Sequence, residues 1–94
     1  MKKNKKQQRL AVFQPEFIED LRYWVDNDRR TALRIFDLLE AIMRDPFQGI
    51  GKPEPLKETL SGFWSRRIDT VNRLVYTIDE STITIISCRY HYES

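Results

Sequence analysis

The chain has 94 residues, of which 40% are hydrophobic and 12% aromatic, and its formal net charge is +2. This length and composition fit one small packed domain, which excludes two independent cores and a disordered chain. The apolar runs, Leu10–Phe13 among them, are too short for a membrane span or a secretory leader, so we expect neither.

The positive charge is concentrated at the start of the chain. Residues 1–9 carry five Lys or Arg and no acid, residues 10–50 carry five basic and eight acidic residues, and residues 51–94 carry six of each. A short basic segment is usually a solvated arm and less often an electrostatic contact for nucleic acid. We predict a basic, flexible tail over residues 1–8 and a single domain over residues 9–94.

The first predicted elements are a strand over residues 9–13 and an amphipathic helix. Pro15 suits the first turn of this helix, where a missing backbone N–H costs nothing. The apolar residues recur at helical spacing: Phe17, Leu21, Trp24 and Val25.

A second amphipathic helix follows at once. Asn27 and Asp28 break the first helix and can cap the second, and Pro46 ends it. Its apolar positions again have helical spacing: Ile35, Leu38, Leu39, Ile42 and Met43. Two helices joined by so short a link are expected to pack as an antiparallel hairpin.

The second half of the chain has β character. Residues 47–60 hold too many glycines and prolines for any regular element, whereas residues 63–68, 73–78 and 82–90 are rich in Val, Ile, Thr and aromatic residues. The predicted fold is therefore α+β, with an N-terminal strand and an antiparallel helical hairpin packed on one face of a three- to four-stranded antiparallel sheet. Its other face is left open to solvent or a ligand.

Glu54 lies between two prolines, Pro53 and Pro55. Each proline fixes its own φ and favours an extended residue before it, so the Glu54 carboxylate is held on a stiff backbone. Such rigidity indicates more than a simple connection, although an ordinary surface glutamate in a turn is the alternative.

Three arginines occupy the first two strands of the predicted sheet. Arg66 and Arg67 are adjacent and point to opposite faces. A four-residue turn places Arg66 on the same face as Arg73, whereas a five-residue turn or a bulge places Arg67 there. The alternative for all three is a set of solvated strand charges paired with carboxylates: Asp69, Asp79 or Glu80.

The last two strands are expected to be joined by a three-residue turn at residues 79–81, which sets Ile78 opposite Thr82. This register carries one group of residues to one side of the sheet: Arg73, Val75, Ser87, Arg89 and His91.

The only histidine, His91, and the only cysteine, Cys88, narrow the possible chemistry. One cysteine excludes an internal disulfide and a cysteine-based zinc site, and it indicates a reducing, cytoplasmic compartment. One histidine excludes mechanisms that need two imidazoles, and we expect no metal and no cofactor. Cys88 alternates with Ile86 in a strand and is expected in the core rather than as a reactive thiolate.

One carboxylate, one imidazole and several guanidiniums form a minimal set for metal-independent RNA cleavage. The carboxylate of Glu54 can take a proton from a ribose 2′-OH, and protonated His91 can donate one to the departing 5′-oxygen. Arginines can neutralise the charge that develops on the phosphate. A half-buried structural histidine is the alternative for His91.

Four segments resemble the YoeB toxins of the RelE superfamily. They are Gly51–Lys57, Leu60–Ile68, Arg73–Tyr76 and Cys88–Tyr92, and the resemblance spans roughly residues 10 to 92. It implies the toxin of a type II toxin–antitoxin system, a ribosome-associated endoribonuclease that cleaves mRNA in the decoding site and inhibits translation. It also implies a RelE-like fold, a cognate YefM-type antitoxin as partner, and no membrane association; a homodimer stays open.

The resemblance also assigns roles to individual residues. Glu54 is similar to the general base of the family, His91 to its general acid, and Arg73 to the arginine that stabilises the phosphate. Lys57 and Arg67 correspond to supporting cations, which favours the register with Arg67, and Tyr92 corresponds to a tyrosine that contacts substrate.

The sequence departs from the family at three places. Glu93 and Ser94 follow the His-Tyr pair at which relatives commonly end, and Asn72 stands where many relatives have a histidine. Residues 1–8 have no counterpart in the short relatives. The alternatives are a non-enzymatic toxin on the same scaffold, such as a ParE-like gyrase poison, and an inactive relative that only binds a partner.

Overall fold

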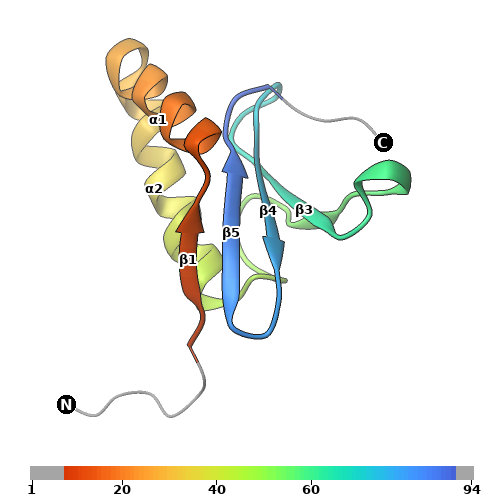
Figure 1. Cartoon of the computed structure of the whole chain (residues 1–94). Coiled ribbons are helices and arrows are strands. Elements are labelled where there is room, and N and C mark those ends of the chain that lie inside the picture. Colours follow the sequence, from red (N-terminus) through yellow and green to blue (C-terminus); the bar gives the residue numbers. More distant parts are fainter. Residues whose placement is uncertain (1–7, 91–94) are drawn as a thin grey trace, which may run out of the picture.

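The computed structural model describes residues 8–90, so most of the predicted tail, and both His91 and Tyr92, lie outside the described residues. Two helices lie together on one side of a sheet (Figure 1). The elements in chain order are β1 (Leu10–Phe13), α1 (Pro15–Asn27), α2 (Arg29–Arg44), β2 (Glu54–Pro55), a 3₁₀ turn (Glu58–Leu60), β3 (Phe63–Arg67), β4 (Arg73–Ile78) and β5 (Thr82–Ser87).

The α+β architecture with a helical hairpin on one sheet face is confirmed, but the sheet differs from the prediction. It has five strands in the order β1-β5-β4-β3-β2, not three to four. It is also mixed, because β1 pairs with β5 in parallel while all other pairs are antiparallel. Helical periodicity predicted α1 and α2, but the direction of an edge strand depends on where the chain returns, which local pattern does not encode.

The helix boundaries follow from the predicted signals. Pro15 is the first residue of α1. Asp28 caps α2, its Oδ1 accepting a hydrogen bond from the backbone N–H of Thr31 at 3.2 Å, and the helix ends at Arg44, two residues before Pro46. Among residues 8–90, neither helix is long and apolar enough to cross a membrane.

The core forms where the inner faces of both helices meet one face of the sheet. Buried residues of α1 and α2 form one side of the core, and buried residues of β4 and β5 form the opposite side. The largest apolar members that are fully buried are Phe17, Ile35, Leu38, Ile42, Leu74, Tyr76, Ile83 and Ile85. Because side chains alternate along a strand, the residues between these point to the opposite face of the sheet.

Two local predictions in the second half of the chain are wrong. The segment expected to hold no regular element contains β2, where Glu54 pairs with Ser65 and Pro55 with Trp64. Pro55 is tolerated because β2 is an edge strand, in which one missing ladder donor can face away from the sheet.

The register between β4 and β5 also differs from the prediction. Ile78 pairs with Ile83 rather than Thr82, because the turn closes with a hydrogen bond from the Asp79 N–H to the Thr82 carbonyl at 2.9 Å. A bulge between Val75 and Tyr76 then shifts the register. Val75 therefore pairs with Ser87, which keeps these two residues on one face as expected.

Arg66 is fully buried and holds the loop after α2 against the sheet. Its guanidinium donates to the backbone carbonyls of Asp45, Gln48 and Ile50 at 2.6, 3.0 and 3.0 Å, and its Nε donates to the Tyr76 hydroxyl at 3.1 Å. The Tyr76 hydroxyl in turn donates to the Pro46 carbonyl at 2.8 Å. Burial raises the pKa of Tyr76, against the lowering effect of the neighbouring guanidinium.

We expect Arg66→Met to lower the free energy of unfolding by about 3 kcal/mol or more, since it removes every donor to these buried acceptors. Arg67→Met, at an exposed position on the same strand, is the control and is expected to change stability by about 0.5 kcal/mol at most. Urea unfolding of both variants measures the difference. Equal stability of the two would contradict the structural role of Arg66.

Candidate functional site

Three predicted site residues share the sheet face that points away from the helices. Glu54 pairs with Ser65 across β2 and β3, and Arg67 pairs directly with Arg73 across β3 and β4. The five residues between the two arginines form the turn, so Arg67 rather than Arg66 lies beside Arg73. Arg66 points into the core instead, which excludes the solvated strand charge considered for it.

The spacing of these residues suits one small anion. Arg67 follows Ser65 by two residues, a rise of roughly 7 Å along the strand, and neighbouring strands are about 5 Å apart. The Glu54 backbone is thus displaced diagonally from that of Arg67 by roughly 8 Å, a gap that the two long side chains can close around a phosphate group.

Small side chains occupy the middle of this face. Ser65, Val75 and Ser87 are 3%, 1% and 1% exposed, and they come from three adjacent strands. Glu54 pairs with Ser65, and Arg67 and Arg73 follow on the neighbouring positions of the same face, so the three long side chains lie next to residues that are almost completely covered. Strand alternation predicted that Val75 and Ser87 share a face, but no sequence signal singled out these small residues.

The Arg73 side chain is partly buried on this face. Its Nη1 is buried yet makes no hydrogen bond among the described residues. A buried donor without a partner is costly, and a guanidinium N–H binds phosphate oxygens strongly. The Arg73 charge also helps to lower the pKa of the nearby Asp69 carboxyl.

Lys57 is exposed and lies just before the 3₁₀ turn, three residues after Glu54. This turn stands on the far side of the sheet from the helical hairpin (Figure 1). Lys57 is thus on the same segment as Glu54, where it can act as a peripheral cation.

The described chain ends beside Arg73. The backbone N–H of Arg73 donates to the Tyr90 carbonyl at 2.9 Å. Tyr90 is the last described residue, and His91 follows it in the sequence. His91 and Tyr92 lie outside the described residues, so the roles expected for them stay predictions.

Arg89 does not lie on the face of Arg73, which corrects the predicted grouping. Its guanidinium stacks on the ring of Tyr23 in α1 at 3.5 Å from the centroid. The reason is that β5 ends at Ser87, and the residues after it bind to helix α1 instead of continuing the sheet. Trp24 Nε1 donates to the Cys88 carbonyl at 2.8 Å.

The Cys88 N–H also donates to the carboxylate of Asp20 at 2.9 Å. Burial raises the pKa of Asp20, although that hydrogen bond and Arg89 oppose the shift. Cys88 is fully buried, and burial together with Asp20 raises the pKa of its thiol. The expectation of a core cysteine is confirmed.

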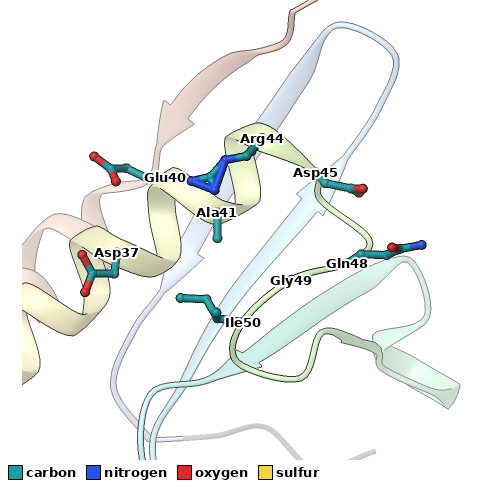
Figure 2. Close-up of a pocket in the computed structure, with 8 residues that line it drawn as sticks. All are labelled: Asp37, Glu40, Ala41, Arg44, Asp45, Gln48, Gly49 and Ile50. Atoms are coloured by element: carbon teal, nitrogen blue, oxygen red, sulfur yellow. The ribbon is translucent and has the colours of Figure 1, made fainter.

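A cavity of about 530 Å³ lies away from this face, between the C-terminal half of α2 and the loop after it. Figure 2 shows Ala41 on the helix and Ile50 on the loop pointing into the space between them. None of the predicted site residues lines it. Its wall includes the carboxylates Asp37, Glu40 and Asp45. Over residues 8–90, no three potential ligand side chains are grouped to hold a metal ion.

Known proteins resemble the chain over most of its length. The profile of the family described as YoeB-like toxin of bacterial type II toxin–antitoxin system matches residues 13–92. Toxin YoeB of Mycobacterium bovis is 54% identical over 84 residues, which covers 89% of this chain and 99% of the relative.

Two solved structures show the same fold with substantial identity. A YoeB/ParE toxin from Agrobacterium tumefaciens has a TM-score of 0.84 and 40% identity, covering 88% of this chain and 99% of its own. A heterotetrameric YoeB–YefM toxin–antitoxin complex from Staphylococcus aureus has a TM-score of 0.79 and 45% identity, covering 90% and 99%.

Acid is expected to weaken the fold through Asp69. Desolvation raises its pKa, but the N–H groups of Asn72 and Val71 and the Arg73 charge outweigh it, so the net pKa is lowered. A carboxyl with a lower pKa in the folded state stabilises the fold above its unfolded pKa, and this contribution is lost as pH falls through the folded value. Asp69→Asn should therefore lose less unfolding free energy than wild type between pH 5 and pH 2, measured by urea unfolding. An equal loss in both proteins would contradict this assignment.

Proposed function

The chain belongs to the YoeB-like toxins of bacterial type II toxin–antitoxin systems, and we propose that it acts as a ribosome-associated endoribonuclease that cleaves mRNA and inhibits translation. The observation that supports this proposal is the shared face of Glu54, Arg67 and Arg73, with Arg73 bonded to Tyr90, the residue that precedes His91 in the sequence. A carboxylate and two guanidiniums on one sheet face suit a phosphodiester with its ribose.

The proposed reaction is an in-line attack within the RNA. Glu54 removes the proton from the ribose 2′-OH, and this oxygen attacks the adjacent phosphorus. The bond to the 5′-oxygen breaks, and protonated His91 supplies the proton that this oxygen needs. The products are a 2′,3′-cyclic phosphate, or a 3′-phosphate after hydrolysis, and a 5′-hydroxyl.

The cations and the tyrosine have supporting roles in this proposal. Arg73, which is partly exposed, donates to the non-bridging oxygens as charge builds in the transition state. Arg67 stabilises the same charge, and Lys57 attracts the flanking backbone. Tyr92 contacts the substrate by stacking on a base or donating to a phosphate.

We further propose that the partner of this chain is a cognate YefM-type antitoxin. The relative from Staphylococcus aureus is in complex with YefM. A disordered antitoxin segment that folds on the toxin can cover the site and block access of mRNA. The second macromolecular partner is the ribosome, which presents the message in the decoding site.

Glu54→Gln and His91→Gln are each expected to reduce cleavage by on the order of 10²-fold or more, since each removes one general acid or base. The measurement is cleavage of ribosome-bound message by purified protein, followed by primer extension. Glu58→Gln is the matched control, an exposed carboxylate four residues from Glu54, and should cleave like wild type.

The same variants separate the alternatives. Growth arrest by Glu54→Gln and His91→Gln equal to that of wild type would favour a non-enzymatic toxin over the nuclease. Protein that binds its antitoxin but neither arrests growth nor cleaves RNA would indicate an inactive relative.

Cleavage is expected to persist in excess EDTA when the ribosomes are kept intact by polyamines. The reason is that carboxylate, imidazole and guanidinium supply the base, the acid and the positive charge that a metal ion would otherwise supply. Loss of cleavage in EDTA with intact ribosomes, and its return on adding Mg²⁺, would contradict the metal-independent mechanism.

A further inference from the structure

The backbone of Tyr90, the residue directly before His91 in the sequence, has an uncommon conformation. Its φ is +67°, in the left-handed region that side-chain-bearing residues seldom adopt, and its side chain is 62% exposed. A strained residue persists only where its surroundings impose it, and such residues concentrate at functional sites.

Both backbone polar groups of Tyr90 are bonded to the β3–β4 turn. Its N–H donates to the side-chain Oδ1 of Asn72 at 2.6 Å, and its carbonyl accepts from the N–H of Arg73 at 2.9 Å. The second contact is a backbone contact that any residue at position 73 could make. The first depends on the side chain at position 72.

The Asn72 amide is itself fixed by Asp69. Its Nδ2 donates to both carboxylate oxygens of Asp69 at 3.2 Å, and the same carboxylate accepts the backbone N–H groups of Val71 and Asn72 at 2.8 and 2.7 Å. Because Nδ2 must face the carboxylate, Oδ1 must face Tyr90. The turn therefore presents one acceptor in a fixed direction.

We propose that Asn72 is a positioning residue for the cleavage reaction: held by Asp69, it fixes the backbone of Tyr90, the residue directly before the proposed general acid His91. This inference rests on the proposed function. The same turn also carries Arg73, because Arg73 follows Asn72 directly in the chain.

Helix α1 holds the other side of the same segment. Trp24 and Asp20 bond the Cys88 peptide, and Tyr23 stacks with Arg89. Residues 88 and 89 are thus fastened to the helix, so the torsions around Tyr90 are the last freedom before His91. Asn72 restrains that freedom.

The β4–β5 turn offers a matched control at the opposite end of β4. Asp79 there makes the same kind of turn, its Oδ1 accepting from the N–H groups of Ser81 and Thr82 at 2.9 and 2.8 Å. It is exposed, like much of the β3–β4 turn, and none of its described hydrogen bonds joins it to residues 88–90.

The experiment compares Asn72→Ala with Asp79→Ala in single-turnover cleavage of ribosome-bound message. A misplaced general acid slows the chemical step, so Asn72→Ala should lower the rate at saturating ribosomes by about 10- to 100-fold with little change in the half-saturating concentration. Asp79→Ala should retain the wild-type rate. Urea unfolding of both variants corrects the rates for the folded fraction.

A swap of the two side-chain groups provides the rescue. In the double variant Asp69→Asn/Asn72→Asp, the amide at 69 can donate to the carboxylate at 72, whose other oxygen still accepts from Tyr90. The swap keeps one acid in the turn and should restore the rate to within about threefold of wild type. Loss of stability alone would not give this pattern of loss and rescue.

The inference is overturned if Asn72→Ala cleaves at the wild-type rate, if Asp79→Ala is slowed as much, or if the swap is as slow as Asn72→Ala. His91→Gln in the same assay separates this failure from that of the proposed function. When His91→Gln is slow and Asn72→Ala is not, only the positioning role is lost. When His91→Gln is as fast as wild type, the proposed general acid is wrong.

Discussion

The burial of one arginine organises this small domain. Arg66 is the last residue but one of β3, with its charge in the core, and it bonds backbone carbonyls of the loop that follows α2 rather than a carboxylate. Three carbonyls and a hydroxyl share its donors, so the desolvated guanidinium is satisfied. The loop so held leads directly to Gly51, whose carbonyl accepts the Arg67 N–H at 2.7 Å, and from there to Glu54. The position of the candidate base thus depends on a residue that never reaches the site.

The close packing around Arg66 explains two glycines of this loop. A Cβ at Gly51 would lie 2.7 Å from Leu38 and 3.1 Å from Arg66, and one at Gly49 would lie 3.0 Å from the Arg66 guanidinium. Both also have positive φ, which glycine adopts without strain. The Gly-Ile-Gly sequence therefore serves a close approach between loop and strand. It does not form a phosphate cradle.

The two faces of the sheet have different roles: one packs against the helices, and the other carries the candidate site. Alternation along β3 sends Arg66 inwards and Arg67 outwards, so adjacent and chemically identical residues have unrelated roles. At the end of the same sheet, helix α1 contacts residues 88 and 89, and the β3–β4 turn contacts Tyr90. This meeting joins the N-terminal helix, the turn and the last described residues into one support for the candidate site, although they are distant in sequence.

The sequence by itself determined the two helices, the three long strands, the core cysteine and the stiff backbone of Glu54, because periodicity, capping residues and prolines act over a few neighbouring positions. It left open whether Arg66 or Arg67 faces Arg73, and it missed β2, the parallel pairing of β1 and the departure of Arg89 toward Tyr23. Only the tertiary structure decided these points. A register is set by turn closure and bulges, an edge strand by where the chain returns, and a contact such as that between Asn72 and Tyr90 by the meeting of segments 18 residues apart, none of which leaves a periodic trace in the sequence.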